Sequence, residues 1–142
     1  MSSLAKVVKA FFKEFMHSFG LKLLEEVNQS FDVIKIVLKR RVGSLDNDSI
    51  AKEIIILVKE QLLAAWGTVV IKYKTNGRLS WLEKILLKII DPFVIKEINS
   101  LDNYQDELFE FLSNNINEGK TDEAVEWMRA KVLSFVSKVF GL

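Results

Sequence analysis

The sequence predicts an all-α domain of five to six helices packed around one largely buried central helix. Apolar residues recur at helical spacing along most of the 142-residue chain. One proline and six glycines are too few for the turns of a many-stranded sandwich or barrel. In the most apolar stretch, residues 49–73, the polar clusters fall about seven residues apart and so form one stripe on a helix. A helix that is apolar around most of its circumference has to be covered by other elements or by lipid, and the first alternative makes this the central helix of the domain.

Composition indicates a single globular domain, residues 1–142. Apolar residues make up 49% of the chain, which excludes disorder, and no internal repeat or linker divides it. Cysteine is absent, so disulfides and thiolate metal sites are excluded. Lys9, Lys13 and Glu14 interrupt what would be the apolar region of a secretory signal, while charged residues split the most apolar stretch. We therefore expect a cytoplasmic protein without a membrane span.

Two helices are expected before the central one. The first begins at Ser2 or Ser3, either of which is a good N-cap, and ends near Phe19 with Gly20 as its stop. The second runs from Leu21 to Val42.

The central helix is expected at about residues 48–74, with Asp48 or Ser49 as its cap. Its most buried positions should include Ile54, Leu57, Leu62 and Leu63. Residues 68–79 leave an alternative open, because β-branched residues followed by Asn76-Gly77 are typical of a hairpin. Helix is preferred, since the capping box that begins at Ser80 leaves too few residues for a return strand.

The remaining helices are marked by their caps. One runs from Trp81 to Ile90, after which Asp91-Pro92 either kinks it or starts a short new helix. Asp102 should cap the next helix. Residues 114–120 are expected to form a loop, and Thr121 should cap the last helix.

No set of residues predicts catalysis or cofactor binding, so we expect a protein that is not an enzyme and holds no cofactor or metal. Glu14 and His17 match the Glu-x-x-His spacing of di-iron bundles, but such a site needs a second copy of the motif and the chain has one histidine. His17 also shares its helix face with lysines. Asp106 and Glu110 lie one turn apart and are interpreted as a solvated face.

Lys35, Lys39, Arg40 and Arg41 form the best candidate patch for an anion or a partner. Cations in the last turn of a helix also complement its dipole, which explains the cluster without a ligand. The balanced charge of the whole chain, +1, and the absence of a phosphate loop disfavour nucleic acid.

An apolar surplus and an uneven charge distribution carry the functional prediction. Phe11, Phe12, Phe15 and Phe19 form an amphipathic interaction face on the first helix, opposite its lysines. Residues 1–43 hold eight Lys and Arg against four Asp and Glu, whereas residues 101–142 hold four against eight. We therefore expect a non-enzymatic structural or interaction protein that forms a homo-oligomer or docks on a protein partner. The alternative is a membrane-active protein that binds lipid surfaces through amphipathic helices.

Overall fold

The computed structural model describes residues 2–42, 45–75 and 81–142, and this part of the chain is helical without strands. The predicted all-α class is confirmed. Its elements are α1 (Ser3–Val42), α2 (Asn47–Thr75), α3 (Trp81–Asn99), the 3₁₀ helix η1 (Ser100–Tyr104), α4 (Gln105–Asn114) and α5 (Lys120–Phe140). Helix, not hairpin, is therefore correct up to Thr75. The predicted turn at Asn76-Gly77 and the cap at Ser80 lie outside the described residues.

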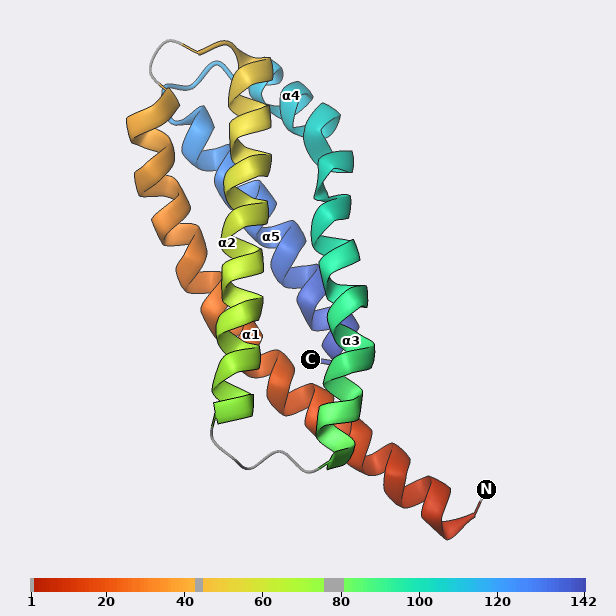
Figure 1. Cartoon of the computed structure of the whole chain (residues 1–142). Coiled ribbons are helices and arrows are strands. Elements are labelled where there is room, and N and C mark those ends of the chain that lie inside the picture. Colours follow the sequence, from red (N-terminus) through yellow and green to blue (C-terminus); the bar gives the residue numbers. More distant parts are fainter. Residues whose placement is uncertain (1, 43–44, 76–80) are drawn as a thin grey trace.

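The helices form four rods, because α3, η1 and α4 follow one another along one side of the molecule (Figure 1). Successive rods run in opposite directions, as in an up-down-up-down bundle. The closest packing is of α1 on α2 and on α5, with α4 closing the bundle against α2. The predicted bundle of five to six helices around one central helix is therefore not quite matched.

Helix α1 runs unbroken through Gly20, so the prediction of two helices with a stop at this glycine is wrong. Gly20 is buried, and a Cβ atom placed on it would lie 2.4 Å from Cβ of Phe140 on α5. The missing side chain thus serves close helix packing instead of helix termination. The predicted start is correct, since the Ser2 Oγ accepts a hydrogen bond from the Ala5 N–H at 3.1 Å.

Helix α2 has nearly the expected bounds, but it is only partly covered. Just 44% of its most apolar 18-residue window is buried, so the prediction of a largely buried central helix is corrected. Ile54, Leu57 and Leu62 are buried as predicted, whereas Leu63 is 40% exposed and was assigned wrongly to the core. Neighbouring rods cover one side of α2, and Leu63 faces the other.

The cap of α2 is Asp46, two residues before Asp48 and three before Ser49, the two predicted caps. Its Oδ1 accepts the backbone N–H of Ser49 at 2.8 Å, and this hydrogen bond lowers the pKa of the Asp46 carboxyl below its ordinary value.

Helix α3 passes through Pro92 without ending, so of the two alternatives at this point the new helix capped by Asp91 is wrong. The Asp91 carboxylate instead accepts a hydrogen bond from Nε1 of Trp66 on α2 at 2.6 Å. Asp102 does not cap α4 either, because its two oxygens both lie 3.1 Å from Nζ of Lys59. Thr121 lies inside α5, whose first residue is Lys120. Asp91 and Asp102 thus bind residues of α2, and Thr121 lies within α5, although each of the three was predicted to cap a helix.

One apolar core joins all the rods. At one end of this core, aromatic rings from α1, α2 and α5 meet. The centroid of the Phe19 ring lies 5.2 Å from that of Trp66, 4.7 Å from that of Tyr73 and 6.2 Å from that of Phe140. The contact between Gly20 and Phe140 lies beside these rings, so it fixes how closely α5 packs on α1.

Candidate functional site

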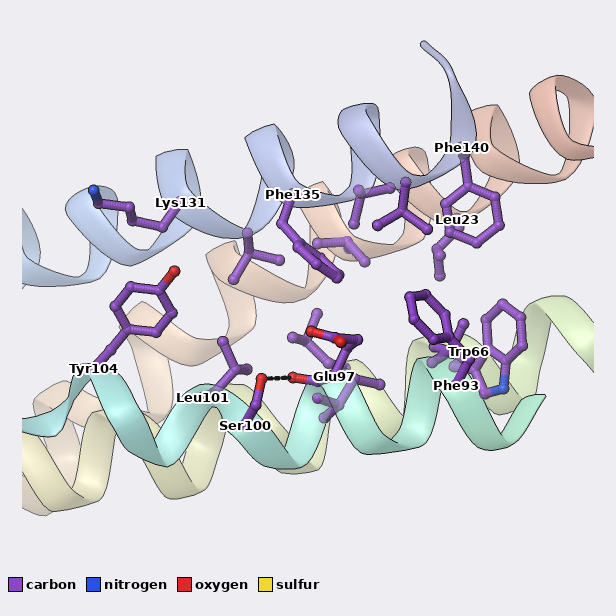
Figure 2. Close-up of a pocket in the computed structure, with 17 residues that line it drawn as sticks. Leu23, Trp66, Phe93, Glu97, Ser100, Leu101, Tyr104, Lys131, Phe135 and Phe140 are labelled. Atoms are coloured by element: carbon purple, nitrogen blue, oxygen red, sulfur yellow. Dashed lines mark hydrogen bonds between the residues drawn. The ribbon is translucent and has the colours of Figure 1, made fainter. Parts of the chain in front are cut away.

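One concave site is a cavity between α5 and the α3–η1 segment, with a volume of about 90 Å³ (Figure 2). It exists because α5 packs closely on α1 and α4 but not on α3. Apolar side chains form most of its wall: Leu23, Val27, Leu62, Trp66, Phe93, Val94, Ile98, Leu101, Val132, Phe135, Val136, Val139 and Phe140. We call this site the α3/α5 cavity.

The α3/α5 cavity has one polar end and one apolar end. Figure 2 shows Tyr104 and Lys131 on facing segments at one end, while Trp66 and Phe140 lie at the other. Glu97 reaches into the space between the two helices from α3. Apolar walls with a few converging polar groups are the usual character of a site for a small amphipathic ligand.

Phe93 and Phe135 mark the mouth of the cavity, and both are partly exposed, at 48% and 40%. Both rings belong to the pair of helices that do not pack closely, so the opening lies between them. Trp66, at 3% exposure, is by contrast covered.

A second surface lies where α1 extends beyond the bundle. Residues 3–14 of α1, which we call the arm, are all exposed except the partly buried Phe11. Figure 1 shows the arm passing the start of α3 and ending away from the other rods. Between the arm and α3 lies an open cleft of about 510 Å³, with Leu82 and Leu86 on its α3 side.

This end of the molecule combines exposed apolar residues with lysines, and we call it the basic apolar end. Its exposed large apolar residues are Leu4, Val7, Val8, Phe12, Trp81, Ile85 and Ile89. Its exposed lysines are Lys6, Lys9, Lys13, Lys84 and Lys88. The acidic residues in the same two segments, 3–14 and 81–90, are Glu14 and Glu83. A positive, apolar surface therefore remains at this end of the bundle.

The predicted amphipathic face divides into two parts. Phe15 and Phe19 are core residues, at 6% and 1% exposure, so their assignment to an interaction face is wrong. Phe12 is 39% exposed and Phe11 lines the cleft beside the arm. The apolar stripe of α1 is thus buried in the core at Phe15 and Phe19, and lies outside the core at Phe11 and Phe12.

The predicted cationic patch is mostly paired within the chain. Lys35 forms an ion pair with Glu126 on α5, Lys39 lies 3.4 Å from Asp122, and Arg41 lies 3.9 Å from Glu53 on α2. Arg40 is exposed and makes no ion pair within the described residues. The structure brings the four residues together, but the three ion pairs explain their clustering without an external anion.

His17 and the acidic pair do not form a metal centre with their neighbours. His17 is exposed on α1, and Asp106 and Glu110 are exposed on α4. In the ranges 2–42, 45–75 and 81–142, no three His, Cys, Asp or Glu side chains gather closely enough to hold a metal ion.

Sequence reasoning missed the polar residues that line the α3/α5 cavity: Glu97, Ser100, Tyr104 and Lys131. Glu97 and Tyr104 are seven residues apart and so share a helix face, but nothing along the chain relates Lys131 on α5 to them. The one available signal was the breadth of the apolar faces, which exceeds what a single neighbouring helix covers.

By length and composition alone, α2 is the one described helix that could cross a membrane, although core helices often meet the same criteria. Comparisons with protein-family models, with curated proteins and with solved structures found no match for this chain.

Proposed function

We propose that this chain is a non-enzymatic interaction protein that docks on an anionic lipid surface through its basic apolar end. The observation that supports this most directly is the coincidence of exposed apolar side chains and exposed lysines on the arm and on the start of α3. Interfacial helices have this composition, with lysines on one face and Phe, Leu or Trp on the other. Trp81, at 73% exposure, is of the residue type that favours the headgroup region.

The charge of this end favours lipid over a second copy of the chain. Two basic apolar ends brought together would place five exposed lysines of each copy against those of the other, and like charges oppose such a contact. An anionic leaflet attracts the same lysines, with about 1 kcal/mol for each cation near the surface. The expected cytoplasmic location would present this end to the more anionic leaflet of a cell membrane.

Self-association is the second candidate, and a different surface supports it. Ile56 and Leu63 lie on the uncovered side of α2, at 48% and 40% exposure. Lys52 and Glu60, of opposite sign, are exposed on the same helix. A surface that carries both positive and negative charges can pair with a second copy of itself. A homo-oligomer formed through α2 would therefore bury the exposed apolar residues of that helix.

Vesicle cosedimentation with the full chain tests the proposal. We expect binding to vesicles that contain phosphatidylglycerol, and little binding to pure phosphatidylcholine. The double variant Trp81→Gln/Ile89→Gln should bind at least about tenfold more weakly, because two large apolar side chains would no longer enter the interface. The matched control is Phe109→Gln/Ile116→Gln, which removes two exposed apolar residues at the other end of the bundle.

Equal weakening by both double variants would contradict docking through the basic apolar end. If no vesicle is bound, and ultracentrifugation shows a dimer that Ile56→Gln/Leu63→Gln dissociates, the second candidate replaces the first.

A further inference from the structure

We infer that the α3/α5 cavity binds a medium-chain fatty acid, with the carboxylate at Lys131 and Tyr104 and the tail toward Trp66 and Phe140. Figure 2 shows this polarity along the space between α5 and the α3–η1 segment. The inference does not depend on docking at the basic apolar end, because it concerns a different surface and a ligand that is free in solution.

The size of the cavity sets the length of the chain that it accepts. One water needs roughly 10–15 Å³ of such cavity volume, so about 90 Å³ is room for roughly six to nine water-sized groups. A methylene group is close to a water molecule in volume. Along α5, the distance from Lys131 to Phe140 is about 13 Å at the helical rise. A fatty acid of about eight to ten carbons has a tail of about seven to nine carbons beyond its carboxyl group and fits both limits, whereas a long membrane lipid chain does not.

The charges at the polar end select a carboxylate. Lys131 lies over the Trp127 ring, with Nζ 5.2 Å from its centroid, and makes no ion pair within the described part of the chain. The Tyr104 ring, half-buried on the facing segment, presents its hydroxyl on the same side. Once the Lys131 ammonium turns from the Trp127 ring toward the cavity, it and the phenol O–H are two donors for one carboxylate.

Glu97, in the middle of the cavity, disfavours a negatively charged group at that point of the ligand. Its side chain extends between the helices, and the carboxylate forms no ion pair within the described part of the chain. It would repel a second negative group on the ligand and would attract an amine. Only the methylene groups of a monocarboxylate would pass Glu97, which avoids the repulsion of a second negative group, although covering this carboxylate costs free energy and limits the affinity.

Fluorescence quenching in a variant with a single tryptophan tests both binding and orientation. Of the three tryptophans, only Trp66 lines the cavity, so Trp81→Phe/Trp127→Phe leaves one reporter at its apolar end. We expect ω-bromodecanoate, used below its micelle concentration, to quench Trp66 saturably and with one molecule per chain. We expect α-bromodecanoate, whose bromine is beside the carboxylate, to compete for the site but to quench it much less.

Two lysine variants test the carboxylate contact. Lys131→Gln should weaken decanoate binding about three- to tenfold, as expected for a partly solvated charged hydrogen bond. Lys138→Gln is the matched control, because it removes the same charge from the same helix outside the cavity lining. It should leave the affinity unchanged. Val136→Phe should block binding by filling the space, with the melting temperature as a check on folding.

The assignment is overturned if neither bromodecanoate quenches saturably, or if both quench Trp66 equally. Tighter binding of decylamine than of decanoate, lost on Glu97→Gln, would assign the cavity to amines. If Val136→Phe does not fold, the comparison of the two bromodecanoates still decides. Loss of vesicle binding in Trp81→Gln/Ile89→Gln, with decanoate binding retained, would show that the two surfaces act separately.

Discussion

Gly20 and Phe140 come so close that a methyl group on Gly20 would lie 2.4 Å from the Phe140 Cβ and 2.9 Å from its Cγ. The Phe140 Cβ is attached to the backbone of α5, so it cannot move away unless the helix moves. Gly67 differs in this respect, because a Cβ placed on it meets nothing within 4 Å. Both glycines lie within helices, but only at Gly20 does the packing leave no room for a side chain.

Gly67→Ala should stabilise the protein by about 0.5–1 kcal/mol, because alanine is the better helix former and the space is open. Gly20→Ala gains the same propensity but overpacks the interface between α1 and α5, which costs about 1–3 kcal/mol. At a contact of 2.4 Å we expect the upper end of that range, and a net loss of about 2 kcal/mol. Urea unfolding followed by far-UV circular dichroism measures both values. Two shifts of the same sign would contradict this assignment of Gly20.

At the scale of an element, α2 shows how far an apolar pattern can be interpreted. Its strongly apolar stretch predicts a helix, and Ile54, Leu57 and Leu62 are indeed buried. The pattern does not determine which side is covered, because leucine and isoleucine lie on both sides. Leu63 is apolar and exposed for that reason.

Adjacent leucines on α2 provide a direct test. Leu62→Ala should lower the free energy of unfolding by about 2–5 kcal/mol, since the side chain is buried in the core. Leu63→Ala should cost less than about 1 kcal/mol, because this side chain already contacts solvent. Thermal or urea denaturation of the two variants at low protein concentration makes the comparison. Equal losses that grow with concentration would instead indicate that another copy covers Leu63.

At the scale of the whole molecule, the charge difference between the two ends of the chain is partly used within the chain. Lys35 and Lys39 on α1 pair with Glu126 and Asp122 on α5, and Arg129 on α5 lies 2.7 Å from Asp32 on α1. Contacts between subunits are not needed to explain these charges. Exposed pairs of this kind contribute little stability, so they act mainly by fixing how the two rods face each other.

The sequence was sufficient for the all-α class, the Ser2 cap and much of the core, because these depend on local preference and periodicity. The unbroken α1 and the Asp91–Trp66 bond were not predictable, since each depends on a partner far along the chain. The α3/α5 cavity was still less accessible, because it depends on which rods pack closely. From neighbouring residues alone, a glycine is assigned to a helix end and an aspartate to a helix cap. Only the folded structure shows the distant residue that each of them contacts.

The unbroken course of α1 has a consequence for proteolysis. Proteases cut backbone that unfolds locally, and a helix end that touches little else opens far more easily than a core helix. Lys6, Lys9 and Lys13 all lie in the exposed arm, ahead of the first buried residue, Phe15. Brief trypsin treatment should therefore remove the arm first and leave the four-rod bundle, which mass spectrometry would identify. The trimmed protein should melt cooperatively and lose affinity for anionic vesicles.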